Sequence, residues 1–409
     1  MGKYKAVGIH VFAGGFTMGV QKEFDVDCQL EVHNFGREST EELCKIPFVN
    51  HEEAKWPNVD AQFAYGNPRC TGFSCITAGY GGETHGPWAN CTEDIHQLCK
   101  YAAGRYDAVI WESVQQAYSV GRPLLDYLRD DIFKPKGYRI AHIMLNAASC
   151  GNAQQRKRYF FVAYRDDRNF NIVPPDISPY EMITADVLWD RRNRETHEGN
   201  IGAKSTDYDE DTYIRLTPEE KVCVRNLPNG WNANMLGKWD YDRLPERWKL
   251  IWDCRESEMP FSMHCVFRMN WLRPFPTIHS SAARFIHPDH HRPLTVGEVA
   301  TGMGWEGIPR GPQPIPQIAK GVVPAVGQWL AQQVKLYLDN AWGDEDWESR
   351  YDANAGEWVG GDANGSLEKT FNLTQYVGRH FDRERYEHVK PTQLHKFNVD
   401  ERTGRPIRS

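Results

Sequence analysis

Short apolar runs alternate with helix-like stretches over residues 1–165, and this alternation constrains the fold more than any other feature of the sequence. Apolar runs bounded by polar turns are typical of strands, and they predict strands at residues 5–11, 28–32, 61–65, 108–111, 138–145 and 159–163. Apolar residues recur at helical spacing in residues 92–102 and 123–132. Strands and helices in alternation predict a doubly wound α/β sheet, which holds ligands at the carboxyl ends of its strands.

The rest of the chain divides into parts of different composition. Residues 166–269 are rich in Pro, Asn, Asp and Trp and show only short ambiguous runs, which predicts a second, irregular domain. Helical spacing returns at residues 294–303 and 325–338. From residue 340 acidic residues and glycines predominate, which predicts a solvated linker, and the mixed-charge segment 367–409 favours an accessory helix.

The composition limits where the chain works and what it binds. We find no secretory leader and no apolar run of about 18 residues, so we expect a cytoplasmic protein without a membrane span. Ten cysteines are scattered without regular pairing, which is typical of reduced thiols. Because the net charge is -7, any surface that binds nucleic acid has to be a local basic groove.

A glycine-rich turn follows the first predicted strand, where residues 12–19 read Phe-Ala-Gly-Gly-Phe-Thr-Met-Gly. Glycines allow a tight turn and a close approach of the backbone to a ligand. Glu31 ends the second predicted strand, at a separation along the chain where an acid commonly binds a nucleoside ribose. A purely structural turn explains the same glycines, so this pattern alone leaves both interpretations open.

A cysteine and three charged residues lie at the ends of other predicted strands. Cys70 belongs to the loop of residues 66–74, Gly-Asn-Pro-Arg-Cys-Thr-Gly-Phe-Ser, where Pro and Gly shape a turn that can expose a thiolate. Glu112 ends the next strand, and Arg156 and Arg158 lead into another. A buried structural cysteine and a solvated charged face are the alternatives. Together, however, the four side chains are expected to converge on one rim of the sheet and to suit covalent attack on a polar heterocycle.

In order and spacing, these motifs resemble those of the DNA (cytosine-5)-methyltransferase family from about residue 8 to residue 335. The correspondence pairs the family's Pro-Pro-Cys-Gln with residues 68–71, Glu-Asn-Val with 112–114, Gln-x-Arg-x-Arg with 154–158, Arg-Pro-x-Pro-Thr-Ile with 273–278 and Gln-Ile-Gly-Asn-x-Val-Pro-Pro with 317–324. A His-Pro pair at residues 287–288 and Arg-Pro-Leu-Thr at 292–295 extend it. Several motifs in the right order are far more specific than any one of them.

The resemblance implies a Rossmann-like methyltransferase sheet with a smaller target-recognition domain, acting on a cytosine flipped out of double-stranded DNA. It implies that Cys70 attacks carbon 6 and that Glu112 holds and protonates N3. Arg158 would bind O2, and Arg156 would support the loop or a phosphate. The implied donor is S-adenosylmethionine, and the residues expected to line its site are Phe12, Gly14, Gly15, Phe16, Thr17, Glu31, Pro68, Lys320 and Val322.

The resemblance also implies a role for each part of the chain. Residues 1–165 are expected to form the cofactor-binding catalytic domain, and residues 166–269 the target-recognition domain that reads DNA. Residues 270–339 would return to complete the catalytic domain, and residues 340–409 would form an acidic linker and C-terminal extension. We expect a bacterial or phage-infected cell as the setting, with neither a resident metal nor an obligatory protein partner.

The chain departs from the family pattern at several positions near the expected reacting groups. Residues 8–15 read Gly-Ile-His-Val-Phe-Ala-Gly-Gly, whereas the family usually carries Asp-Leu-Phe-x-Gly-x-Gly-Gly. Arg69 replaces a proline beside the nucleophile, Thr71 replaces a glutamine, and Ser113 replaces an asparagine. Drift in a distant, phage-borne member explains these changes without a change of function.

Lys320 is the sharpest departure, because the family carries an asparagine there. An ammonium group about 5 Å from a sulfonium would cost on the order of 3 kcal/mol at an effective dielectric of about 20, which is more than about a hundredfold in affinity. Either Lys320 turns to solvent or pairs with an acid, or the donor carries an anion. Carboxy-S-adenosylmethionine has such a carboxylate, which Lys320 could bind with help from Arg69 or His10. The product would be 5-carboxymethylcytosine, whereas methyl transfer is the default of the family.

Three other interpretations compete with a DNA-modifying enzyme. A zinc site could use His85, Cys91, His96 and Cys99, but their spacings match neither a zinc finger nor a zinc ribbon. A non-catalytic DNA-binding relative would have no need of all four candidate catalytic side chains. The same chemistry on tRNA or on a free nucleotide is also compatible, and of these a recognition region of about a hundred residues favours a polymer.

Overall fold

The computed structural model describes most of the chain from Lys3 to Gly361. The described residues are 3–51, 55–73, 87–167, 182–191, 196–199, 209–246, 248–249, 266–279, 285–311, 313–341, 351–352 and 357–361. The accessory helix predicted for residues 367–409 therefore lies outside the described residues, as does a large part of the predicted recognition region.

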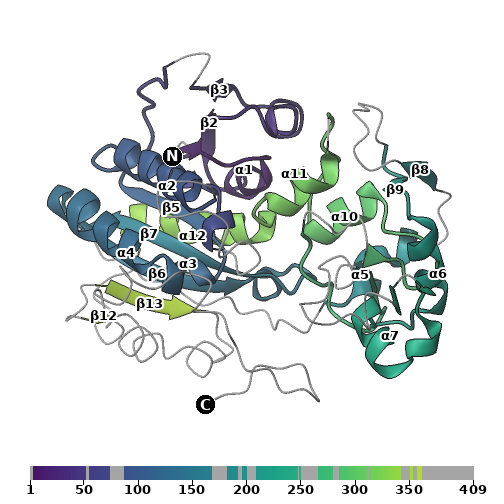
Figure 1. The fold of residues 1–409 in the computed structure, drawn as a ribbon. Coiled ribbons are helices and arrows are strands. Elements are labelled where there is room, and N and C mark those ends of the chain that lie inside the picture. Colours follow the sequence, from purple (N-terminus) through teal and green to yellow (C-terminus); the bar gives the residue numbers. More distant parts are fainter. Residues whose placement is uncertain are drawn as a thin grey trace.

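A single mixed sheet organises the fold (Figure 1). Its strands lie in the order β3-β2-β1-β4-β5-β7-β6-β13-β12. The first seven of these strands in chain order are β1 (Lys5–Ile9), β2 (Asp25–Glu31), β3 (Phe48–Asn50), β4 (Phe63–Gly66), β5 (Ala108–Ser113), β6 (Tyr138–Asn146) and β7 (Lys157–Arg165). Strand β7 runs antiparallel to both β5 and β6, whereas β1 to β5 pair in parallel. The doubly wound α/β sheet is thereby confirmed, and the carboxyl ends of β1, β4 and β5 share one edge.

The strands are apolar throughout because both faces of the sheet are covered. Successive residues alternate between two cores, so that Ile110 belongs to one and Trp111 to the other. The first core lies under α1 (Gly15–Val20), α10 (Val296–Met303), α11 (Pro314–Lys320) and α12 (Pro324–Leu338). The second lies under α2 (Pro87–Ala102), α3 (Gln116–Val120) and α4 (Arg122–Tyr127). This two-sided burial explains why the strands read as continuous apolar runs rather than alternating ones.

The region after β7 packs around a separate, smaller core, which Figure 1 shows to one side of the sheet. Apolar side chains such as Leu216, Val224 and Leu236 fill this core. The described α-helices and strands between β7 and α10 are α5 (Thr184–Leu188), β8 (His197–Gly199), β9 (Thr212–Ile214), α6 (Pro218–Asn226), α7 (Ala233–Trp239), β10 (Phe267–Arg268) and β11 (Phe285–Ile286). Ile286 of β11 is buried in the small core, so a strand from the returning segment also contributes to it.

The segment after residue 340 differs from the solvated linker expected there. Strands β12 (Tyr351–Asp352) and β13 (Glu357–Gly361) join the sheet, and β13 runs parallel to β6. The free edge of β6 carries unpaired backbone N–H and C=O groups that any extended segment can satisfy. The prediction failed because the acidic and glycine-rich composition outweighed the short Trp-Val pair at residues 358–359.

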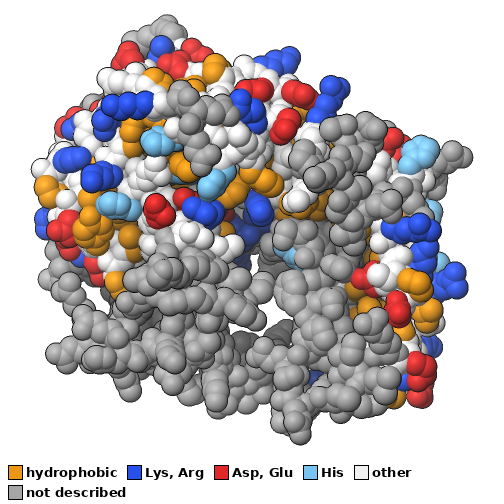
Figure 2. All heavy atoms as spheres, turned by 45° about the horizontal axis from the view of Figure 1, so that its top comes forward, with side chains coloured by type: hydrophobic (Ala, Val, Ile, Leu, Met, Phe, Trp, Pro, Cys, Tyr) orange, Lys and Arg blue, Asp and Glu red, His pale blue; other side chains and the backbone are white. Residues whose placement is uncertain are grey.

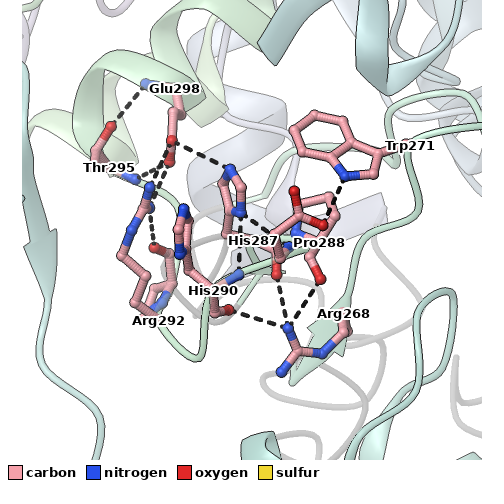
Figure 3. Close-up of polar contacts among 10 residues, drawn as sticks. Arg268, Trp271, His287, Pro288, His290, Arg292, Thr295 and Glu298 are labelled. Carbon is pink, nitrogen blue, oxygen red and sulfur yellow. Dashed lines mark hydrogen bonds and ion pairs between the residues drawn. The ribbon is translucent and has the colours of Figure 1, made fainter. Parts of the chain in front are cut away.

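A buried ion pair fixes the junction between the small core and the sheet (Figure 3). The Arg292 guanidinium donates to both Glu298 carboxylate oxygens, at 2.8 and 2.9 Å, and Glu298 also accepts from the Thr295 backbone at 2.7 Å. Across the loop, Arg268 of β10 donates to the carbonyl oxygens of His287 and His290, at 2.9 and 3.1 Å. The loop between β11 and α10 is therefore tied to both parts of the molecule.

We expect Glu298→Gln to destabilise the fold by about 3–5 kcal/mol, because it leaves the buried Arg292 charge without its partner. Burial alone would raise the pKa of Glu298, but the hydrogen bonds and charge of Arg292 hold it below the ordinary value of 4.5. The carboxylate's contribution is therefore present above pH 4.5 and is lost as the pH falls through the lowered pKa. Urea unfolding at pH 7 and at pH 4 measures both effects.

The matched control is Glu306→Gln, which removes the exposed partner of Lys22 at 3.1 Å. Because both side chains are exposed, we expect a change below about 0.5 kcal/mol. Equal losses of stability at positions 298 and 306 would contradict the structural role assigned to the buried pair.

Candidate active site

Glu112 at the end of β5 is the centre of the candidate site. Its carboxyl group is 2% exposed, forms an ion pair with the Arg158 guanidinium at 2.9 Å, and accepts a hydrogen bond from the Asn67 side chain. The backbone N–H of Asn67 in turn donates to the His10 carbonyl at 2.8 Å, which connects the loops after β4 and β1. Cys70 lies in the same loop and interacts electrostatically with Glu112. The structure therefore brings together the side chains predicted from the sequence.

Burial and the neighbouring guanidinium groups shift the pKa values of the carboxyl group and the thiol in opposite directions. Burial raises the pKa of Glu112, although Arg158, Arg156 and the Asn67 amide act in the opposite direction. Burial and the neighbouring Glu112 also raise the pKa of Cys70, while both guanidinium groups lower it. A protonated Glu112 can donate to a ring nitrogen.

The two arginines occupy different environments. Arg156 is 4% exposed and donates to the carbonyl oxygens of Ile278 at 2.7 Å, Ala319 at 2.9 Å and Gly321 at 3.2 Å. Burial lowers its pKa to about 9. These contacts attach the chain at residues 278 and 319–321 to the residue before β7. The side chain of Arg158 is 20% exposed, and together with Glu112 and Arg156 it lines a small cavity.

The loop after β1 has an unusual backbone that Glu31 holds in place. His10, Phe12 and Gly14 have positive φ angles of 54°, 65° and 74°. The Glu31 carboxylate accepts from the backbone N–H groups of Val11 at 2.5 Å and Phe12 at 3.1 Å. Left-handed backbone is costly for residues with a side chain, so these hydrogen bonds help to maintain it. Glu31 therefore shapes the loop that was expected to carry the cofactor.

Polar groups that the sequence did not reveal lie beneath this loop. The Gln29 side chain donates to Glu31 at 2.8 Å and to the Phe12 carbonyl at 3.2 Å, and it accepts from Thr17 at 3.2 Å. Tyr65 donates to the Thr17 hydroxyl at 2.8 Å. A glutamine that alternates with a glutamate in an otherwise apolar strand is the signal that could have identified Gln29.

The other expected cofactor residues lie in and around α1. Phe16 and Thr17 are fully buried and support the loop from below. Gly15 lies against the chain after α11, since a Cβ added there would come within 2.6 Å of the Val322 carbonyl oxygen. Pro68 is buried in the loop before Cys70.

Lys320 at the end of α11 lies over two aromatic rings. Its Nζ is 4.6 Å from the centroid of the Phe35 ring and 5.8 Å from that of Phe12, and the two rings meet edge to face. Lys320 is exposed as a whole residue, while the partial burial of its ammonium lowers its pKa and the nearby Cys70 acts in the opposite direction. The ammonium therefore lies close to both the loop after β1 and Cys70, and it forms no ion pair with any described residue. Phe35 was not expected from the sequence.

The described residues offer little support for a metal site or a membrane segment. No group of three or more His, Cys, Asp or Glu side chains among them could hold a metal ion. Cys91 and Cys99 are fully buried in the core under α2, and His85 lies outside the described residues. No helix in the described ranges is long and apolar enough to cross a membrane.

We expect Glu31→Gln to stabilise the fold at alkaline pH. Burial raises the pKa of Glu31 from 4.5 to about 8, so the unfolded chain loses this proton at lower pH than the folded chain. The wild-type protein therefore loses stability as the pH rises from 4.5 to about 8. Glutamine keeps an oxygen for the Val11 and Phe12 amides, so the variant should be more stable at pH 8 by more than about 1 kcal/mol.

Urea unfolding of both proteins at pH 4.5 and pH 8 tests this expectation. The variant's advantage should shrink at pH 4.5, opposite to the trend expected for Glu298→Gln. A stability difference that is the same at both pH values would contradict it.

Comparisons with known proteins agree with this geometry. The model of the C-5 cytosine-specific DNA methylase family matches residues 42–335. The chain is 24% identical over 322 residues to the type II methyltransferase M.DdeI of Desulfomicrobium norvegicum, covering 69% of this chain and 74% of that protein. A solved structure described as a DNA modification methyltransferase encoded within an E. coli prophage superposes with a TM-score of 0.53 at 15% identity, covering 82% of this chain and 100% of the other.

A second solved structure, the Entamoeba histolytica methyltransferase EhMeth, superposes with a TM-score of 0.50 at 9% identity. It covers 83% of this chain and 99% of that chain. At these identities the structural matches show the fold alone, whereas the family model spans most of the chain. The protein therefore belongs to the C-5 cytosine-specific DNA methylase family.

Proposed function

We propose that this protein transfers a one-carbon group to carbon 5 of a cytosine in duplex DNA, with Cys70 as the covalent nucleophile. The observation that carries the proposal is the buried Glu112 carboxyl, fixed by Arg158 and Asn67 beside the half-buried Cys70 thiol. A thiol, a protonated carboxyl and a guanidinium at one rim of a sheet match what attack on a pyrimidine ring requires.

The residues around the loop after β1 fit S-adenosylmethionine, the donor that this family uses. Gly14 leaves no room for a side chain, because a Cβ there would come within 2.8 Å of the Cys44 sulfur. Glu31 would face the ribose, and the Phe12 and Phe35 rings would face the adenine or the sulfonium. When bound, the donor supplies an electrophilic carbon beside the nucleophile loop.

In the proposed mechanism, each catalytic side chain acts on one atom of the base. The Cys70 thiol gives its proton to water, and the resulting thiolate forms a bond to carbon 6 while Glu112 gives its proton to N3 and so neutralises the charge that moves into the ring. Arg158 would hold O2. Carbon 5 would then form a bond to the transferred carbon as that carbon's bond to the donor's sulfur breaks, after which carbon 5 loses its proton to water and N3 returns its proton to Glu112. The carbon 5–carbon 6 double bond forms again as the sulfur–carbon bond breaks and Cys70 leaves.

Duplex DNA is proposed as the substrate, with residues 166–269 as the part that reads sequence. The small core lies to one side of the sheet (Figure 1), so a duplex could contact both parts of the chain. Figure 2 shows Lys and Arg side chains beside a hollow on the face turned forward. A local basic surface of this kind is what a chain with a net charge of -7 needs to bind a polyanion. Competition between duplex DNA and tRNA distinguishes the two substrates.

We expect Cys70→Ala to abolish modification of DNA and to abolish a covalent protein–DNA adduct on 5-fluorocytosine DNA, which blocks loss of the group on carbon 5. Denaturing gel electrophoresis detects the adduct, and mass spectrometry of nucleosides detects the product. Cys150→Ala is the matched control, because Cys150 is the other half-buried free cysteine among the described residues. If Cys70→Ala binds and modifies DNA as the wild type does, the covalent mechanism is wrong. If both the wild type and Cys70→Ala bind DNA without modifying it, the protein is a non-catalytic relative.

Carboxymethyl transfer is a second candidate, because Lys320 lies where a donor's transferred group would approach Cys70. Of the two groups expected to help, Arg69 is already bound by Asp94, and burial lowers the pKa of His10 to about 4 and keeps it neutral. Lys320 would therefore act alone. Its ammonium lies over the faces of Phe12 and Phe35, where it would repel the sulfonium that either donor carries, and a carboxylate on the transferred carbon would offset this repulsion by pairing with Lys320.

We expect the wild-type protein to form 5-carboxymethylcytosine from carboxy-S-adenosylmethionine, and Lys320→Asn to lose this product more than about tenfold while gaining methyl transfer. Mass spectrometry of nucleosides after incubation with each donor measures both. Lys335→Asn, on the exposed side of α12, is the control. A wild-type protein that forms only 5-methylcytosine, unchanged by Lys320→Asn, leaves plain methyl transfer as the function.

A further inference from the structure

The loop that carries Cys70 is fastened to α2 on both sides of the nucleophile. On one side, Arg69 donates through Nη2 to one Asp94 oxygen at 2.7 Å and pairs through Nε with the other at 2.5 Å. On the other side, residues 71–73 pack against α2, where Cys91 interacts with the Gly72 backbone. Residues 69 and 72 flank Cys70, so the nucleophile lies between two attachments to the same helix.

The two residues of α2 that contact the loop lie on the same face of the helix. Cys91 and Asp94 are three residues apart on α2, so their side chains lie on one face of the helix. Both are buried, with exposures of 0% and 3%. A guanidinium that meets a carboxylate through two nitrogens fixes direction as well as distance, which a single hydrogen bond does not.

Arg69 occupies the position at which the family motif described above, Pro-Pro-Cys-Gln, has its second proline. A proline ring fixes φ of its own residue and so removes freedom from the chain just before the nucleophile. Arg69 has no such ring, and its backbone N–H donates to no described residue. The ion pair between the Arg69 side chain and Asp94 on α2 restricts the same backbone position through a tertiary contact.

We propose that Arg69 and Asp94 are positioning residues for Cys70, and that their ion pair replaces the backbone restriction that a proline at position 69 would supply. This inference rests on the proposed role of Cys70 as nucleophile. It concerns the placement of the sulfur, not binding of the donor, so it predicts a loss of turnover without a loss of donor affinity.

The first test is Asp94→Asn, which keeps the volume of the side chain and removes its charge. We expect kcat to fall about 10- to 100-fold while the KM for the donor stays within about twofold, because the sulfur is no longer held in line with the base. In the free protein, Cys70 should react with iodoacetamide more than about fivefold faster, since the loosened loop exposes it. Cys150 is the internal reference in the same peptide map, and its reaction rate should not change.

The second test compares two double variants that both lack the ion pair. Asp94→Asn combined with Arg69→Pro restores restriction of the backbone, whereas Asp94→Asn combined with Arg69→Ala does not. We expect the proline variant to recover turnover to within about threefold of the wild type, and the alanine variant to stay as slow as Asp94→Asn alone. Thermal unfolding confirms that both are folded.

Two results would overturn the proposal. One is equal turnover of the proline and alanine double variants when both are folded. The other is a parallel rise in the reactivity of Cys70 and Cys150 in Asp94→Asn, which would indicate general loosening. If the wild-type protein modifies no DNA at all, the proposed function fails, but the ratio of Cys70 to Cys150 reactivity still decides whether the pair positions the loop.

Discussion

The buried guanidinium of Arg156 is the contact on which the candidate site depends. It lies just before β7 and donates to backbone carbonyls of Ile278, Ala319 and Gly321, as far as 165 residues away along the chain. Burying such a charge is costly, and each of these hydrogen bonds reduces the cost, so folding favours the arrangement that brings the three carbonyl groups to the guanidinium. The end of α11, and with it Lys320, is thereby held relative to Glu112.

The central placement of β7 explains why this guanidinium can reach so many partners. Because β7 runs antiparallel between β5 and β6, its first residues lie beside the last residues of β5. Arg158 therefore meets Glu112 across neighbouring strands, and Arg156 lies one step further toward the returning segment. The two guanidinium groups beside the buried carboxyl oppose the effect of burial, because they lower the pKa of both Glu112 and Cys70 and so favour the thiolate that the proposed mechanism requires.

Much of the sheet could be predicted because its strands are buried on both faces and therefore read as apolar runs; all six predicted strands of the first 165 residues are present within a few residues. Strand β3 has only three residues, and α1 begins at a glycine, so neither produced a readable period.

In the site, residue types with obvious chemistry were found, such as Glu112. Asn67, Gln29 and Phe35 were not, because an amide or a phenyl ring acquires its role only from what the fold places beside it.

The order in which the chain supplies its parts has a consequence for synthesis. The seven strands from β1 to β7 are complete at Arg165, whereas the carbonyl groups that close the pocket and the helix that covers α1 come after residue 270. A growing chain can therefore assemble its sheet while the pocket is still open. Cys70 and Glu112 are present early, but the carbonyl groups that bind Arg156 join them only after the segment beyond residue 270 has left the ribosome, so the pocket is among the last parts of the fold to form.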